Sequence, residues 1–118
     1  MKLNINKDST LHTLNASPFE HRVLFDRLIR FATPGDSLLL MENGVYTITN
    51  DYCLTTIRAT GIALYCLQHD ILARGLQHLP VLTDEIAGTP KENRIYLIDD
   101  TTFVDISCKH HKIVSWFQ

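Results

Sequence analysis

The sequence lacks the short motifs by which many nucleotide-binding and hydrolytic enzymes are recognised. It contains no G-x-G-x-x-G after its first strand-like run, no G-x-x-x-x-G-K-[ST] and no G-x-S-x-G. A dinucleotide site, a P-loop and a nucleophile elbow therefore have no motif support. The three cysteines, Cys53, Cys66 and Cys108, include no C-x-x-C pair, and their odd number fits reduced thiols better than a disulfide framework.

The chain also lacks strong charge of either sign and long hydrophobic runs. Its 118 residues hold 11 Lys and Arg against 13 Asp and Glu, which gives a net charge of -2, and basic residues do not cluster. We therefore expect no direct nucleic-acid binding. The apolar runs are too short for a membrane span, and the polar start Met1–Thr10 has no secretory signal. These features predict a cytoplasmic protein without a membrane segment.

What the sequence does contain is a complete strand–helix–strand unit between Leu11 and Tyr46. Leu11–Asn15 reads as a strand, and Ser17-Pro18-Phe19-Glu20 follows the capping-box pattern, which predicts a helix from that point. Ser37–Met41 is an uninterrupted apolar run, typical of a strand buried on both faces of a parallel sheet. The apolar stripe predicted for the helix consists of Phe19, Val23, Leu24, Leu28 and Phe31.

Alternating strand and helix patterns continue to the end of the chain. The predicted helical segments are 45–48, 52–59, 71–76 and 101–108, and the further strands are 62–67, 94–98 and 113–117. We expect Asn50 or Asp51, and later Asp99 or Asp100, to cap helices, and Gly61 to end one. Residues 11–118 are thus predicted to form a single α/β domain, preceded by a surface arm over residues 1–10. Its class is a three-layer α/β/α sandwich around a mainly parallel five-stranded sheet.

In such sheets, functional sites lie at the carboxyl ends of the strands. Those ends are predicted at 15–17, 42–44, 67–70 and 99–101, and His69 opens a helix there. His12 lies inside the first strand and is expected to be structural. The loop 78–93 is long for a compact domain, which favours an insertion or a lid. A small-molecule binder that uses this edge and the loop is one interpretation.

No metal or cofactor is expected. Cys108, His110 and His111 are metal-binding residue types, but no second cluster completes four ligands, and we expect a buried thiol beside exposed histidines. Cys53 could gain the positive end of a helix dipole, whereas Cys66 near a strand end is expected to belong to the core. Cys108 falls in the last turn of a helix, where the dipole does not favour a thiolate. None of the three is a strong nucleophile candidate.

Four segments of the sequence are similar to segments of a known protein family. The opening LHTLNASPFE, the run GDSLLLMENGVY, the segment DILARGL and the ending FVDISCKHHKIVSWF resemble the DsrH/TusB family in order and spacing. The resemblance covers nearly the whole chain from Leu11. The leader 1–10 and the stretch 77–93 depart from it as additions to the usual length.

The resemblance implies a DsrE/F/H-like fold and membership of a complex with TusC-like and TusD-like subunits, commonly a hexamer of two heterotrimers. In the TusB branch that complex relays persulfide sulfur toward 2-thiouridine at the tRNA wobble position. The sulfur-accepting cysteine of the TusD-like sister would fall at about Leu67 or Gln68, so Cys66 coincides only approximately. The cysteine of the DsrH branch would fall at Arg27, which carries no thiol. Both departures favour a non-catalytic subunit.

The alternative is a DsrH-like sulfur carrier that uses Cys66 or Cys53 itself, in sulfur transfer or oxidation. For the structural role, we predict that Val45, Tyr46, Trp116 and Phe117 contribute to an interface. A subunit adapted to an interface leaves apolar surface uncovered, so a homo-oligomer in the absence of its partners is also expected.

Overall fold

A computed structural model describes residues 8–82 and 94–117. Five strands form one sheet in the order β4-β3-β2-β1-β5, and every neighbouring pair is parallel. The strands are β1 (Thr10–Leu14), β2 (Ser37–Leu40), β3 (Ala63–Leu67), β4 (Ile95–Ile98) and β5 (Lys112–Trp116). The predicted five-stranded parallel sheet is therefore confirmed.

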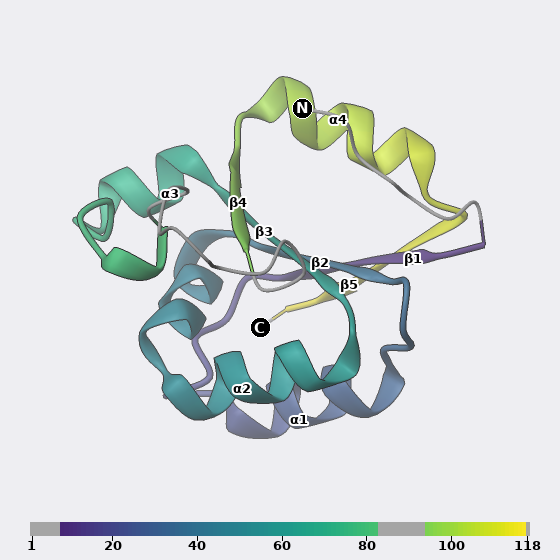
Figure 1. Ribbon diagram of the computed structural model, residues 1–118, viewed down its shortest axis with the longest axis horizontal. Coiled ribbons are helices and arrows are strands. Elements are labelled where there is room, and N and C mark those ends of the chain that lie inside the picture. Colours follow the sequence, from purple (N-terminus) through teal and green to yellow (C-terminus); the bar gives the residue numbers. More distant parts are fainter. Residues whose placement is uncertain (1–7, 83–93, 118) are drawn as a thin grey trace.

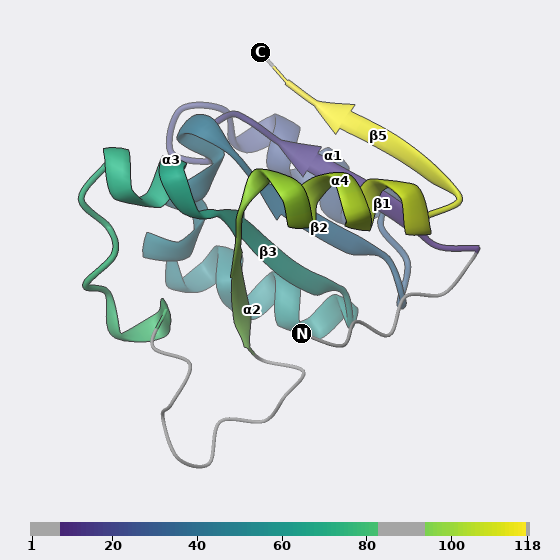
Figure 2. The same ribbon diagram turned by 90° about the horizontal axis from the view of Figure 1, so that it is seen from above.

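Helices cover both faces of this sheet. They are α1 (Arg22–Phe31), α2 (Asp51–Thr60), α3 (Gln68–Ala73) and α4 (Asp100–Lys109), with 3-10 segments η1 (Glu42–Thr49) and η2 (Pro80–Leu82). Figures 1 and 2 show α1 and α2 on one face and α4 on the other. Because β1 to β4 follow one another across the sheet and β5 returns to the far side of β1, right-handed crossovers require this division of the helices. The predicted α/β/α sandwich is confirmed.

The start of α1 differs from the prediction. Ser17 does not cap a continuous helix, because its hydroxyl accepts from the amide of Phe19 at 3.2 Å and its carbonyl accepts from the amides of Glu20 and His21. These bonds close a separate turn, and the helix begins only at Arg22. His21 precedes it without a side-chain capping bond.

The apolar stripe predicted for this helix is accordingly wrong in part. Phe25 and Leu28 are the side chains that α1 buries, whereas Phe19, Val23 and Phe31 are more than half exposed. Phe19 belongs to the preceding turn. Val23 and Phe31 lie outside the face of α1 that packs on the sheet. That face is formed by Phe25 and Leu28, because residues three or four apart in a helix share a face.

The predicted caps of the later helices are confirmed. The Asn50 side chain accepts from the amide of Cys53 at 3.1 Å, and Gly61 ends α2 in the left-handed conformation with φ 75°. Asp99 accepts from the amide of Thr102 at 2.8 Å at the start of α4. In α4, Ile106 is buried, whereas Val104 is exposed. α3 begins at Gln68, earlier than predicted, and Asp70 lies in its first turn, where a carboxylate interacts favourably with the helix dipole.

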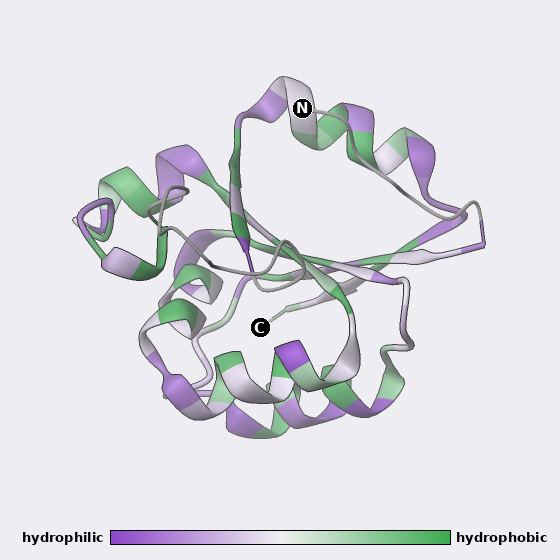
Figure 3. Ribbon diagram, in the orientation of Figure 1, coloured by the Kyte–Doolittle hydropathy of each residue, from purple (hydrophilic) through white to green (hydrophobic). Residues whose placement is uncertain are grey.

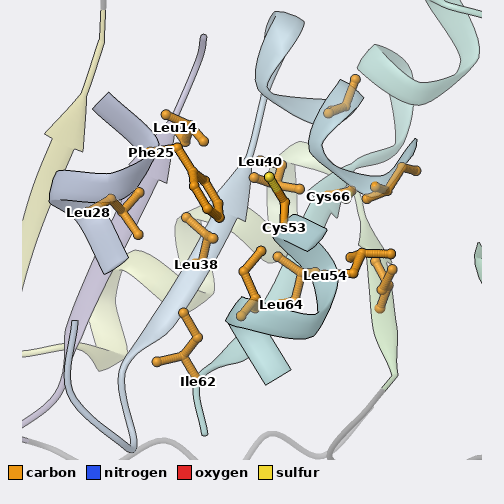
Figure 4. Packing of buried hydrophobic residues seen from close by; sticks show 14 of the residues in the cluster. Leu14, Phe25, Leu28, Leu38, Leu40, Cys53, Leu54, Ile62, Leu64 and Cys66 are labelled. Atoms are coloured by element: carbon orange, nitrogen blue, oxygen red, sulfur yellow. The ribbon is translucent and has the colours of Figure 1, made fainter. Parts of the chain in front are cut away.

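The sheet separates two hydrophobic clusters. The larger lies under α1 and α2 and includes Phe25, Leu28, Leu38 and Leu64 (Figure 4). The smaller lies under α4 and is formed around Tyr65, Ile98 and Ile106, among others. In Figure 3 the strands β2, β3 and β4 are largely hydrophobic, while each helix carries both hydrophobic and hydrophilic residues. This pattern is expected of a sheet buried between two layers of amphipathic helices.

The first strand begins one residue earlier than predicted. Thr10 already belongs to β1, and Ser9 and Thr10 are buried. Residues 1–7, most of the predicted arm, and residues 83–93, most of the predicted loop, lie outside the described residues. The division into an arm over residues 1–10 and a domain over residues 11–118 stays a prediction.

Candidate functional site

The carboxyl ends of β1 and β2 form a small polar pocket. It has a volume of about 160 Å³ and is lined by Asn15, Ala16, Ser17, Glu20, His21, Glu42 and Asn43. This is the edge at which parallel sheets place their sites, as the sequence predicts. Pockets for small molecules usually have about 300–1,000 Å³, so this one fits only a few atoms of a ligand.

The backbone around this pocket is held tightly. A Cβ atom on Gly44 would lie 2.0 Å from the Leu14 carbonyl oxygen, so only glycine lets η1 approach the end of β1 this closely. Glu42 has a positive φ of 49°, and its amide donates to Asp70 Oδ2 at 2.8 Å. Arg74 donates from Nε to Asn43 at 3.1 Å. η1 and α3 therefore fix this edge of the sheet as one rigid unit.

His69 lies at the same edge, as predicted. Its ring is 59% exposed, with Nε2 3.7 Å from an Asp70 carboxylate oxygen and Nδ1 3.6 Å from an Asp100 carboxylate oxygen. These separations exceed hydrogen-bond length. The side chain is thus a solvent-exposed group between two carboxylates, and no cysteine of the described residues is paired with it.

The two cysteines nominated as sulfur carriers are inaccessible. Cys53 on α2 and Cys66 on β3 both have no exposed surface, and Figure 4 shows them within the larger hydrophobic cluster. Burial raises the pKa of the Cys53 thiol and, more strongly, that of Cys66. The amide of Cys53 is capped by Asn50, but burial outweighs any benefit of the helix N-terminus for the thiolate.

Cys108 shows a different environment from the one predicted. It is exposed, whereas the sequence suggested a buried thiol. α4 starts directly after β4 and ends directly before β5, so Cys108 near its end lies at the edge where the strands begin. That edge is opposite to the pocket. The accessible thiol of Cys108 therefore lies at the opposite end of the strands from the polar pocket.

The two neighbouring histidines also differ from expectation. His110 is buried, not exposed, with Nδ1 donating to the Ile106 carbonyl at 2.7 Å and Nε2 2.9 Å from the Ser37 hydroxyl. His111 is exposed, as predicted. Burial of His110 follows from its position where α4 turns into β5 above the start of β2. Among the described residues, no group of three or more His, Cys, Asp and Glu is placed to hold a metal ion.

His12 has the structural role that the sequence suggested. It is fully buried, with Nε2 2.9 Å from Asp36 Oδ2, and Trp116 donates to its Nδ1 at 3.1 Å. Burial by itself would raise the pKa of Asp36, but the amides of Thr10 and Thr33 and the His12 ring hold it below its ordinary value. The group joins β1, the start of β2 and the end of β5.

The four residues predicted for an interface lie in different environments. Val45 has no exposed surface, so it offers nothing to a partner in this fold, because η1 turns it into the larger cluster. Tyr46 and Trp116 are half-buried, and Phe117 is 67% exposed. For these three the interface role stays a prediction.

Sequence reasoning missed two arrangements. One is the contact of Phe31 with Trp116, whose ring centroids are 5.8 Å apart. The other is Asp70, whose carboxylate supports the amide of Glu42. The apolar residues of α1 were the signal for the contact of Phe31 with Trp116, but the sequence pattern predicted that this apolar stripe faces the core. Contacts between residues this distant in sequence leave no local pattern.

Comparisons with known proteins agree with this geometry. The sequence profile of the family described as DsrH like protein matches residues 16–113. Protein TusB of Escherichia coli (strain K12) is 36% identical over 107 residues, which is 90% of this chain and 99% of that protein. Protein TusB of Shigella boydii serotype 18 has the same identity and coverage. None of the described helices is long and apolar enough to cross a bilayer. With a match across most of its length and relatives of this identity, the chain belongs to the DsrH family.

Proposed function

We propose that this chain is a non-catalytic, TusB-like subunit of a cytoplasmic sulfur-relay complex. Its partners in this proposal are TusC-like and TusD-like subunits, in a heterotrimer that pairs into a hexamer. The complex passes persulfide sulfur toward 2-thiouridine at the tRNA wobble position. The chain itself holds the complex together and needs no cofactor.

The placement of the three thiols carries the non-catalytic part of the proposal. Relay of a sulfane sulfur requires a thiolate that can attack one persulfide and be attacked in turn by the next thiol. Cys53 and Cys66 have no exposed surface and raised pKa values, so neither the required ionisation nor access is provided. Cys108 is accessible but lies at the edge of the sheet opposite to the polar pocket.

The residues at the expected sulfur positions support the same reading. Arg27 and Gln68 are exposed and carry no thiol. The rest of the polar edge presents carboxylates, amides and His69, none of which accepts sulfane sulfur. A partner subunit would therefore supply the reactive cysteine.

Association with the partners is the direct test. The chain is co-expressed with the TusC-like and TusD-like subunits of its own source, with an affinity tag on one partner only. The proposal expects all three in one complex with a constant ratio on size-exclusion chromatography. An untagged chain that never accompanies its sisters would contradict it. The tagged partner without its sister is the control for nonspecific retention.

The alternative, a carrier that uses Cys66 or Cys53, is opposed by their burial. It is tested by incubating the purified complex with a persulfide donor and measuring each chain by mass spectrometry. We expect the added sulfur atom on a partner and not on Cys66 or Cys53 of this chain. Sulfur on Cys66 or Cys53 would establish the alternative.

A further inference from the structure

Strand β5 is an edge strand that exposes apolar side chains. Among the described residues it pairs with β1 alone, and it ends the sheet order. Ile113 is 48% exposed, Phe117 is 67% exposed, and the half-buried Val114 and Trp116 point to the other face because successive strand residues alternate. Natural edge strands are usually short or protected by charge. Lys112 and Ser115 are exposed polar residues of β5, but each face also presents apolar side chains, and we expect these to be covered in the assembled protein.

One flank of α1 continues this apolar edge. Phe31 is 52% exposed, and its ring makes an edge-to-face contact with Trp116 at 5.8 Å between centroids. Trp116 is held in turn by its hydrogen bond to the buried His12. The two aromatic side chains are thus fixed before any partner arrives, which lowers the entropy that binding would lose. Fixed, half-exposed Trp and Phe side chains are typical anchors of protein interfaces.

Cations surround these aromatic side chains. Lys112 Nζ lies 5.5 Å from the centroid of the Phe31 ring. Arg27 is four residues before Phe31 and three before Arg30, so both arginines lie on the flank of α1 that faces β5. Both are exposed, and neither forms an ion pair or hydrogen bond with any described residue.

The opposite flank of the same helix is arranged differently. There Arg22 is bonded to Asp26 at 3.1 Å and lies over the ring of Tyr52 on α2. On the α2 side of α1, Arg22 is therefore paired within the chain. On the β5 side, Arg27 and Arg30 form no ion pair with a described residue. A basic rim around an apolar centre is complementary to an apolar recess bordered by carboxylates.

We propose that this edge is the docking surface for one partner subunit of the complex, a protein that presents an apolar recess bordered by carboxylates. The inference rests on the proposed function and adds to it the place and the chemistry of the contact. A second copy of the chain is a poor occupant, because two-fold pairing of this edge would bring like cations together. The α1–β5 surface consists of Val23, Arg27, Arg30, Phe31, Trp116 and Phe117.

Charge reversal tests the proposal without disturbing the core. The double variant Arg27→Glu/Arg30→Glu is compared with Arg94→Glu, an exposed arginine at the start of β4 on the opposite edge of the sheet. Binding to the purified TusC-like and TusD-like pair is measured by titration. We expect the double variant to bind about ten-fold more weakly at low salt, with the difference shrinking as salt screens the charges. The Arg94→Glu variant should bind like the wild type.

A second variant tests the apolar part. Phe117→Ser removes an exposed ring that is not part of the core, and we expect weaker binding at low and high salt alike. If both surface variants bind like the wild type while the complex forms, the docking surface lies elsewhere and this inference is overturned. If the wild type itself does not bind its sisters, the proposed function fails, and the docking inference fails with it.

Two further outcomes would assign the surface to another occupant and so overturn the proposal. One is a homodimer of the chain that Phe117→Ser dissociates while binding to the sisters is unaffected. The other is binding to vesicles of anionic phospholipid that Arg27→Glu/Arg30→Glu abolishes while the complex with the sisters is unaffected. Size-exclusion chromatography and vesicle sedimentation measure these.

Discussion

Trp116 donates a hydrogen bond from Nε1 to Nδ1 of His12, at 3.1 Å, across 104 residues of sequence. This bond assigns the neutral tautomer of His12 that carries its proton on Nε2, since Nε2 faces Asp36 Oδ2 at 2.9 Å. One polar chain thus runs from the exposed end of β5 to the buried start of β2. It links the strand that we propose for docking to the core.

Removing the indole donor should destabilise the fold. In Trp116→Phe a smaller aromatic ring replaces the indole, and Nδ1 of the fully buried His12 loses its partner, which costs about 1–3 kcal/mol. Urea unfolding followed by circular dichroism measures the difference. Phe117→Leu, one residue on and exposed, is the matched control and should change stability by less than about 0.5 kcal/mol. Equal stability of Trp116→Phe and the wild type would show that the bond contributes nothing.

The lowered pKa of Asp36 predicts loss of stability in acid. A carboxyl whose pKa is lower when folded stabilises the protein above its unfolded pKa, about 3.9, and this contribution disappears as pH falls through the lower folded value. We expect wild type to be more stable than Asp36→Asn at pH 6, and the gap to shrink steadily below about pH 4. Denaturant unfolding between pH 2.5 and pH 6 measures it. A gap that is independent of pH would contradict the ionised state of Asp36.

Gly44 predicts a strong steric effect. A methyl group at this position would meet the Leu14 carbonyl at 2.0 Å, a contact with backbone that no rotamer change relieves. We expect Gly44→Ala to destabilise the protein by about 3 kcal/mol or more. Thermal unfolding measures this effect, with Thr55→Ala at an exposed position of α2 as control. An unfolding temperature within a degree of wild type would show that η1 does not approach β1 so closely.

The thiols should differ sharply in reactivity. With the chain folded, Cys108 should react with a thiol reagent within minutes, because it is exposed, while Cys53 and Cys66 should react only after unfolding. Mass spectrometry of the modified protein before and after denaturant counts the labelled residues. Rapid labelling of Cys66 in the folded chain would place a sulfur site on this subunit.

The order of elements could be predicted from the sequence because it depends on local signals. Apolar runs such as Ser37–Met41 and caps such as Asn50 and Asp99 act within a few residues. The strand β2, over Ser37–Leu40, and both caps were confirmed. The start of α1 could not be predicted, because the Ser17 hydroxyl can accept an amide hydrogen bond in an isolated turn as well as at the N-terminus of a helix.

The candidate site depended on contacts between distant segments, which local patterns do not encode. Whether Val23 and Phe31 face the core or the surface depends on how far α1 is rotated over the sheet. Val45 and Cys108 were misplaced for the same reason, because burial within η1 and near the end of α4 is decided by neighbours from other elements. His12 was placed correctly since a histidine in a central strand is nearly always hydrogen-bonded within the protein.

The central claim is that this subunit supports sulfur relay without using its own thiols. The most direct measurement is the 2-thiouridine content of tRNA in cells of the native source in which Cys53→Ala, Cys66→Ala and Cys108→Ala variants, singly and combined, replace the wild-type chain. Co-purification with the partner subunits controls for loss of folding. The account predicts wild-type thiolation for every variant that still assembles, and loss of thiolation by an assembled variant would contradict it.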